Sequence, residues 1–223
     1  MSTRLFFQAI LKFALGVILV GALLFLPAGT LCFARGWVLM GILFLPMFLA
    51  GVWMMCKSPD LLARRLHAKE TRMKQGVIVK LSGLMFIAGF VLAGLGHRFH
   101  WYTLPWSVAI AAAAVFLLGY TLYAAVLREN RFLSRTIEVQ EGQEVVSTGP
   151  YRLVRHPMYT ATLLLFLAMP LVLGSLFALP VFLAFPALLV ARIRNEEELL
   201  AAELPGYTAY QEQVRWRLIP FLW

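Results

Sequence analysis

Ionisable side chains gather at both ends of one long apolar stretch in the C-terminal half of the chain. Arg152, Arg155 and His156 precede the stretch in the segment TGPYRLVRHPMYTAT, residues 148–162, and Arg192 followed by three glutamates closes it. An imidazole can take up a proton near neutral pH, and an arginine can bind an anionic group through two parallel hydrogen bonds. Carboxylates accept hydrogen bonds from hydroxyl or ammonium groups. These residue types predict a site that binds and positions a polar reactant.

The local sequence constrains how these groups are presented. His156 precedes Pro157, which disfavours a helical backbone at the histidine and suits the first position of the next helix. We therefore expect His156 at a helix entrance with its side chain free to meet a ligand. Arg192 and Glu196 are four residues apart and share a helix face. Glu196, Glu197 and Glu198 are consecutive, so only part of that run can face a site.

Each group also has a simpler interpretation. Arg152 and Arg155 would anchor the loop to lipid phosphates, His156 would cap a helix, and the glutamates would form a solvated face. These interpretations stay open for each residue alone. They do not explain why all the groups lie at the two ends of the same apolar stretch.

The composition is that of a membrane protein. The chain has 223 residues, of which 61% are hydrophobic and 14% charged, against about 25% charged in soluble domains. Four apolar stretches are close to the ~20 residues that cross a bilayer as a helix. They are Leu5–Pro27, Gly36–Cys56, Val77–Gly96 and Leu104–Leu127. A signal peptide is the alternative for the first, but its apolar core exceeds the ~7–15 residues of such signals.

A fifth apolar stretch, Tyr159–Ile193, is too long for one span. Gly174-Ser175 interrupts it near the middle, and three prolines weaken its helical continuity. We interpret it as two helices folded into a tight transmembrane hairpin. The sequence thus predicts an all-α integral membrane protein with one domain, residues 1–223, in which 1–127 form four spans and 128–223 form the functional half.

The hairpin explains the polar ends of the apolar stretch. Both of its helices end on the same side of the membrane, so the segment around His156 and the segment around Glu196 must meet there. Ionisable groups at membrane depth tend to be functional. We therefore predict one polar pocket built from residues far apart in the sequence.

Positive charge predicts the orientation. Of the 20 Lys and Arg residues, 18 lie in the two terminal regions and in the segments around 57–80 and 128–155, whereas only Arg35 and Arg98 lie in the two opposite loops. The positive-inside rule places both termini and the polar pocket in the cytoplasm. We expect a bacterial inner membrane, and we interpret the net charge of +9 as topology and contact with anionic lipid. The basic residues are scattered, so nucleic acid is not an expected partner.

Two further expectations concern smaller features. A helix near 58–72, with Leu61, Leu62 and Leu66 on one side, is expected to lie on the inner leaflet or to be only a topogenic run of charge. Cys32 and Cys56 lie at opposite ends of the second span and cannot pair, and the His and Cys spacing predicts no metal site. The oligomeric state is left open.

The C-terminal half resembles the isoprenylcysteine carboxyl methyltransferase family, which is related to phospholipid methyltransferases. The resemblance covers roughly residues 115–223. It rests on GPYRLVRHPMY, the hydrophobic hairpin, the Glu-Glu pair, Tyr207 and Tyr210, a basic patch and Pro220. One feature departs from the phospholipid branch, which carries Gly-x-Gly on a cofactor-facing helix. Here the triplet Gly94-Leu95-Gly96 falls on the outer side by the predicted topology.

The resemblance implies an S-adenosylmethionine site in the cytoplasmic pocket. By position, the implied cofactor-binding residues are Tyr151, Arg152, Val154, Arg155, His156, Tyr159 and Glu197. The resemblance associates Arg192 with catalysis, and Glu196 is expected to orient it. The implied acceptor is a lipophilic or membrane-delivered molecule, such as the carboxylate of a prenylcysteine-like substrate, with phospholipid or thiol acceptors as alternatives. A small transporter and a non-catalytic membrane scaffold are the alternatives outside enzymes.

Overall fold

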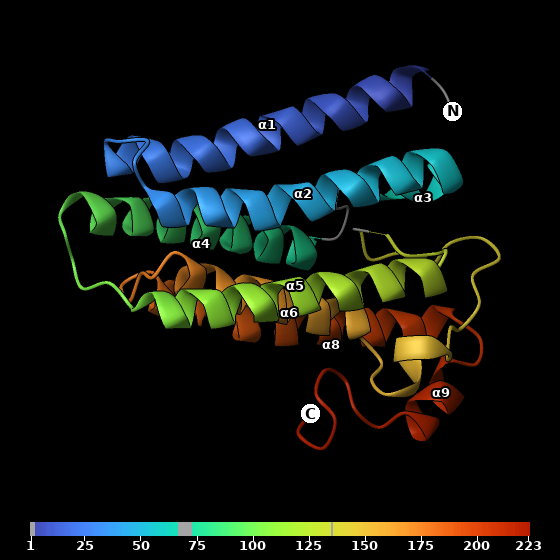
Figure 1. Ribbon diagram of the computed structural model, residues 1–223. Helices are drawn as coiled ribbons and strands as arrows, with labels where there is room; N and C mark the ends of the chain where they lie inside the picture. The colour runs from blue at the N-terminus through green and yellow to red at the C-terminus, as the bar shows by residue number, and fades with distance from the viewer. Residues whose placement is uncertain (1–2, 67–72, 135) are drawn as a thin grey trace.

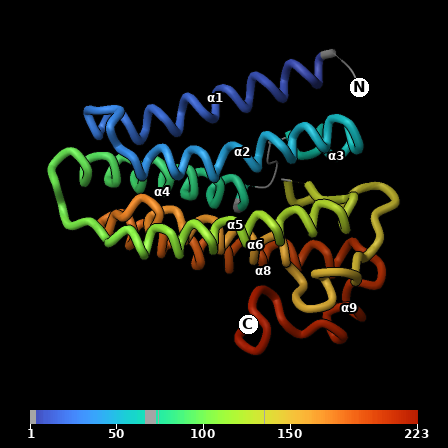
Figure 2. The backbone as a smooth tube through the Cα atoms, in the orientation of Figure 1, coloured from blue at the N-terminus to red at the C-terminus, as the bar shows by residue number. Residues whose placement is uncertain are grey.

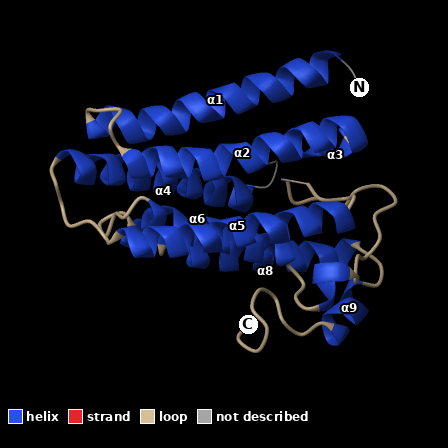
Figure 3. Ribbon diagram, in the orientation of Figure 1, coloured by secondary structure: helices blue, strands red, loops and turns tan. Residues whose placement is uncertain are grey.

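The computed structural model describes residues 3–66, 73–134 and 136–223. Helices account for its regular structure, and these described ranges contain no strand (Figure 1, Figure 3). The elements are α1 (Thr3–Ala28), α2 (Ala34–Lys57), α3 (Pro59–Leu66), α4 (Met73–Arg98), α5 (Trp106–Glu129), the 3-10 helix η1 (Gly149–Arg152), α6 (Pro157–Val172), α7 (Leu179–Phe182), α8 (Phe185–Glu203) and α9 (Tyr207–Gln213). The predicted all-α fold is confirmed.

The helices α1, α2, α4 and α5 coincide with the four predicted spans. Each contains 24 or 25 residues of spanning hydropathy. A helix satisfies its backbone hydrogen bonds internally, which makes it the form in which such apolar segments are stable in lipid. Length, composition and fold together indicate an integral membrane protein.

The long helices lie side by side, roughly along one common direction (Figure 1, Figure 2). Helix α1 packs against both α2 and α4, α2 also packs against α5, and α4 packs against α8, while α5, α6 and α8 lie together on the other side of the bundle (Figure 1). The start of α1, α3, residues 130–134 and 136–156, and α9 lie at the same end, here called the polar end. The α1–α2 and α4–α5 connections lie at the other end, here called the opposite end.

The fifth apolar stretch folds back on itself at the predicted break. Helix α6 ends at Val172, and Gly174 then adopts a φ of +67°, a conformation that favours glycine. The turn is less tight than predicted, because α7 intervenes and α8 begins only at Phe185. Helix α6 has 16 residues, so a full crossing of the bilayer by this hairpin stays a prediction.

Gly119 and Gly94 are among the glycines that allow helices to approach closely. A Cβ atom at Gly119 of α5 would lie 3.0 Å from Leu165 of α6, and one at Gly94 of α4 would lie 2.5 Å from the Leu24 carbonyl of α1. Gly94 belongs to the Gly94-Leu95-Gly96 triplet, which therefore serves helix packing toward the opposite end. The core between the helices is filled by large side chains such as Phe116 and Phe182, both fully buried.

The predicted interfacial helix is α3, and its environment differs from the prediction. Leu61 and Leu62 are each 4% exposed and pack with Ala9, Met54 and Leu127. The apolar side of α3 thus packs against α1, α2 and α5, which leave a matching apolar surface at this end. Its position on the inner leaflet stays a prediction. The rest of the predicted segment, 67–72, lies outside the described residues.

Candidate functional site

Glu197 on α8 is the centre of a buried ionic cluster. Its Oε1 atom accepts a hydrogen bond from Arg155 Nε at 2.7 Å and lies 3.1 Å from His156 Nε2. Its Oε2 atom accepts from Arg217 Nε, also at 2.7 Å. Arg155, His156 and Glu197 are each at most 7% exposed. The cluster joins the loop before α6, which carries Arg155 and His156, to α8 and to the C-terminal tail, which carries Arg217.

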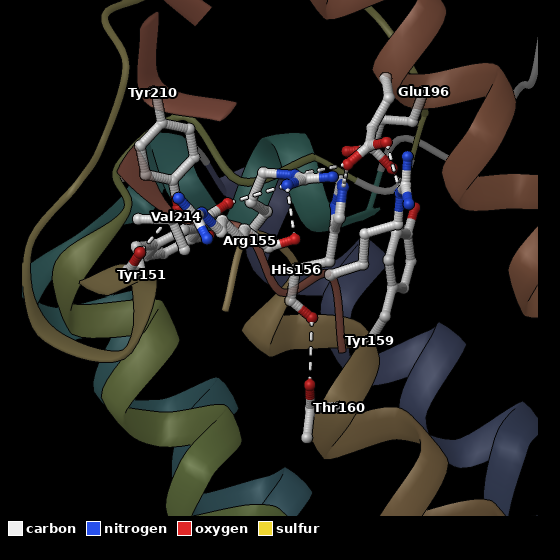
Figure 4. A network of polar contacts seen from close by, with 11 residues as sticks. Tyr151, Arg155, His156, Tyr159, Thr160, Glu196, Tyr210 and Val214 are labelled. Atoms are coloured by element: carbon white, nitrogen blue, oxygen red, sulfur yellow. Dashed lines mark hydrogen bonds and ion pairs between the residues drawn. The ribbon is translucent and has the colours of Figure 1, made fainter. Parts of the chain in front are cut away.

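Backbone hydrogen bonds hold the same segments together. The amides of Arg155 and His156 donate to the carbonyls of Trp216 and Arg217, at 2.8 and 2.9 Å. Arg155 Nη1 also donates to the Val214 carbonyl at 2.8 Å. Figure 4 shows Arg155, His156 and Tyr159 projecting toward Glu196 on α8. The predicted meeting of the loop with the end of the hairpin is therefore present, with the tail as a third wall.

The cluster favours the ionised form of Glu197. Burial alone raises the pKa of this carboxyl, but hydrogen bonds from His156, Arg155 and Arg217 outweigh it and lower the pKa to about 2, from an ordinary 4.5. A carboxylate in this position compensates the buried Arg155 guanidinium, which would otherwise be very costly to bury. Glu197 therefore stabilises the wall of the site through its charge.

The expectation that the His156 side chain is free was wrong. It is 5% exposed, bonded to Glu197 and stacked against Tyr159, with ring centroids 5.7 Å apart. The reason is that a buried polar side chain must find a partner, and Glu197 is the acceptor within reach. His156 still lines the site, but through a ring that its neighbours hold in place.

A second polar chain links Arg192 and Glu196. The Tyr159 hydroxyl donates to Glu196 Oε2 at 2.5 Å and accepts from Arg192 Nε at 2.9 Å. Arg192 Nη1 donates to Gln75 Oε1 of α4 at 3.2 Å, and the Gln75 side chain is almost fully buried. Arg192 and Glu196 thus share a helix face, as predicted, and Tyr159 bridges them.

Both polar groups border one cavity of about 510 Å³. At the polar end, its walls come from residues 130–134 and 136–146, η1, the start of α6 and α9. Toward the middle of the bundle, its walls are apolar and come from α4, α6 and α8. The apolar part is lined by Ile78, Val79, Phe86, Phe166, Phe185, Leu188 and Leu189. The volume falls in the ~300–1,000 Å³ range of small-molecule sites.

The structure separates the predicted site residues into two groups. Those that line the cavity are Tyr151, Arg155, His156, Tyr159, Arg192 and Glu196. Arg152 is exposed, Val154 is buried, and Glu197 lies behind the wall, so these three are not among the lining residues. Direct cofactor contacts from their side chains stay predictions.

Sequence reasoning missed several contributors. Gln75 and Arg65 come from the N-terminal half, and Arg65 both lines the cavity and donates to the Ser134 carbonyl. Arg217 is the third partner of Glu197. A single glutamine or arginine beside an apolar segment has no distinctive pattern, since such residues commonly mark a membrane boundary.

Two tail tyrosines complete the cavity wall. Tyr207 and Tyr210 are each 4% exposed, and both line the cavity. Tyr210 donates to the Tyr151 carbonyl at 2.7 Å. The Tyr207 hydroxyl, in contrast, is buried and has no hydrogen-bond partner within the described residues. An unsatisfied donor beside a cavity indicates a place where a polar ligand could bind.

This arrangement defines a class of protein: a helical bundle with four helices long and apolar enough to cross a membrane, and with a cavity that is polar at one end and apolar at the other. The comparison with known protein families indicates methyl transfer as the reaction class. Residues 106–204, from the start of α5 to the end of α8, match the family model described as phospholipid methyltransferase.

Three relatives are similar over parts of the chain. A Delta(14)-sterol reductase, TM7SF2, from Mus musculus is 35% identical over 91 residues. The cobalt-zinc-cadmium resistance protein CzcN of Cupriavidus metallidurans is 29% identical over 155 residues, and the uncharacterized protein YpbQ of Bacillus subtilis is 31% identical over 96. These alignments cover 40%, 68% and 43% of this chain, and 22%, 66% and 56% of the respective relatives. The family match and the four spanning-length helices together support a membrane methyltransferase.

Proposed function

We propose that this protein is an S-adenosylmethionine-dependent methyltransferase that acts on a lipophilic acceptor delivered through the membrane. The family match supports methyl transfer, and the resemblance to isoprenylcysteine carboxyl methyltransferases makes the carboxylate of a prenylcysteine-like molecule the first acceptor to test. Phospholipid amines and thiols are the other acceptor classes.

The observation that carries the proposal is the two-part cavity. A polar cofactor fits the end formed by the loop, α8 and α9, where hydroxyl, carboxylate and guanidinium groups converge. An apolar acceptor fits the part lined by α4, α6 and α8. One continuous space can thus bring a water-soluble cofactor and a membrane-soluble acceptor into contact.

The residues present fit the proposed cofactor. The unpartnered Tyr207 hydroxyl supplies a donor, and Glu196 offers a carboxylate for the ribose hydroxyls or the ammonium group. The rings of Tyr151, Tyr159 and Tyr210 also border the cavity, and aromatic faces attract a cation such as a sulfonium. When bound, the cofactor supplies an electrophilic methyl group.

The role of the protein in such a transfer is positioning. Nucleophile, methyl and sulfur must approach in line, and holding them so contributes much of the rate. Arg192 is held by Tyr159 and Gln75, so its guanidinium is fixed at the border of the two parts of the cavity. There it binds the anionic group of the acceptor. A carboxylate acceptor is already ionised at pH 7 and needs no base, whereas an amine or thiol would give its proton to Glu196.

The predicted orientation is compatible with a cofactor at the polar end of the cavity and an acceptor in its apolar part. With the polar end in the cytoplasm, the cofactor enters from solution, and the acceptor enters sideways between helices. Val79 and Gly83 on α4 line the apolar part of the cavity and are themselves exposed on the bundle surface. They mark the side on which an acceptor would enter from lipid.

The test is a transfer assay with purified protein and S-adenosylmethionine labelled on the methyl group. Label should appear in at least one of three acceptors: a prenylcysteine, phosphatidylethanolamine or a hydrophobic thiol. One relative is named a Delta(14)-sterol reductase. A parallel assay therefore supplies a sterol as acceptor and a reduced nicotinamide dinucleotide as reductant, and follows reduction of the sterol. Reduction without methyl transfer would refute the proposal, and so would cofactor-independent solute flux in vesicles without methyl transfer.

A further inference from the structure

A second cavity, of about 250 Å³, lies at the opposite end of the bundle, away from the methyl-transfer site. Its walls come from the α1–α2 connection, the end of α4, the α4–α5 connection and the turn after α6. The side chains that line it include Arg35, His97 and Trp106. This volume is below the range of ordinary small-molecule pockets and suits a headgroup-sized ligand.

Arg35 gives the cavity its chemical character. The residue is 7% exposed, its Nη2 atom donates to the Leu104 carbonyl at 2.5 Å, and its guanidinium lies 4.6 Å from the centroid of the Trp106 ring. Its Nη1 atom is buried and has no hydrogen-bond partner among the described residues. This nitrogen lies beside Gly174, where a Cβ atom would be only 1.5 Å away. A buried guanidinium therefore keeps an unused donor at the cavity wall.

The sequence supplies no carboxylate for this arginine. Residues 1–59, 71–128 and 157–195 contain no Asp or Glu, and these ranges include every segment that forms the second cavity. They do contain Arg35, His97, Arg98 and His100 at this end of the bundle. Burying a cation without an opposite charge is costly, so an anion from outside the chain would stabilise it.

The surroundings favour an anion of the membrane surface. Trp37, Tyr102 and Trp106 are each about half exposed or more at the same end, and aromatic side chains of this kind concentrate at the level of lipid headgroups. Arginine binds phosphate oxygens through two parallel hydrogen bonds.

From these observations we infer that the second cavity binds a phosphate group, with Arg35 as its principal ligand. The group belongs to a phospholipid headgroup or to free phosphate, and both present the same oxygens to the guanidinium. Lipid bound here would tie the α4–α5 connection to the turn after α6, which already meet through the Thr103–Ser175 bridge.

The first test needs only the wild-type protein. In a neutral detergent, dihexanoyl phosphatidylglycerol and inorganic phosphate are each titrated while the melting temperature is followed. Stabilisation by the lipid alone identifies a headgroup site, and stabilisation by both identifies a site for the free anion as well. If neither raises the melting temperature, the inference is wrong.

Substitutions then locate the site. Arg35→Gln should weaken the binding of the stabilising probe by about tenfold or more, since a hydrogen bond to a charged group is lost. Arg98→Gln is the matched control, because Arg98 is exposed at the same end and does not line the cavity. Equal weakening in both variants would contradict a specific site. If Arg35→Gln does not fold, Arg35→Lys is the substitute variant, because it keeps the positive charge but lacks the guanidinium. Arg35→Lys should also bind the probe more weakly than wild type does. Unchanged binding would contradict a site that depends on the guanidinium.

Discussion

Arg155 and Glu197, 42 positions apart in the sequence, form an ion pair of 2.7 Å in which each side chain is at most 6% exposed. One partner belongs to the loop before α6 and the other to α8. The pair therefore fastens the two ends of the hairpin to each other. His156 and Arg217 share the same carboxylate, so the wall of the candidate site depends on one charge.

Loss of that charge should destabilise the protein. Breaking a buried ion pair by removing one partner costs about 3–5 kcal/mol, so Glu197→Gln should lower the melting temperature by several degrees in detergent. Glu198→Gln is the control, because that neighbour is exposed. Equal melting temperatures for the two variants would show that the cluster does not stabilise the fold.

The same cluster predicts a pH dependence. The pKa of Glu197 is lowered to about 2 in the folded protein, so its contribution to stability is complete above the ordinary pKa of 4.5 and is lost as the pH falls toward 2. The difference in melting temperature between wild type and Glu197→Gln should be constant at neutral pH and shrink below about 4.5. A difference that grows on acidification would contradict this assignment.

Substitutions at Tyr207 and Tyr210 should have different effects, one on ligand affinity and the other on the stability of the fold. Tyr207→Phe removes a hydroxyl that has no partner in the described part of the chain, so the unliganded protein should be as stable as wild type or slightly more so. Its affinity for S-adenosylhomocysteine should fall by about 1 kcal/mol, or roughly fivefold. Tyr210→Phe removes the hydrogen bond to the Tyr151 carbonyl and should destabilise the fold. Isothermal titration and thermal melts distinguish the two, and unchanged affinity in Tyr207→Phe would contradict the proposed contact.

Arg192 should matter more for turnover than for cofactor affinity. Loss of one positioned donor typically costs about 10²–10³ in turnover, and we expect Arg192→Ala to fall in that range. Arg192→Lys should recover little, because a point charge cannot reproduce the planar contacts with Tyr159 and Gln75. Arg194→Ala is the control, since Arg194 is exposed two residues away. Equal effects of Arg192→Ala and Arg194→Ala would leave Arg192 as a marker of the membrane boundary.

The orientation can be checked in a cysteine-free background. Glu141→Cys should react with an impermeant maleimide only after the membrane is opened, whereas Tyr102→Cys should react in intact cells. Both positions are exposed in the structure. The reverse pattern would place the polar end outside and remove the proposed route of the cofactor from the cytoplasm.

The sequence predicted the features that depend on hydropathy and chain reversal. The four spans matched α1, α2, α4 and α5, because a run of apolar residues leaves a helix as the stable form in lipid. The break at Gly174 followed from residue type. Once the hairpin was expected, the segment around His156 and the segment around Glu196 were expected to meet, since both ends had to reach the same side. The particular pair that Arg155 forms with Glu197 was not predicted.

The rest depended on rotations that sequence patterns do not specify. The rotation of α6 against α8 decides which side chains meet. It turns His156 toward Glu197 and places Tyr159 between Arg192 and Glu196. Gln75 reaches Arg192 from a helix more than a hundred residues away in the sequence. Nothing in the local sequence of either residue indicates that contact.

The most direct measurement of the central claim is the binding of S-adenosylhomocysteine to the purified wild-type protein in lipid nanodiscs. We predict saturable binding with a stoichiometry near one, displaced by S-adenosylmethionine and not by a reduced nicotinamide dinucleotide. Absence of saturable binding to a protein that melts cooperatively would contradict the account, and so would displacement by the nicotinamide dinucleotide.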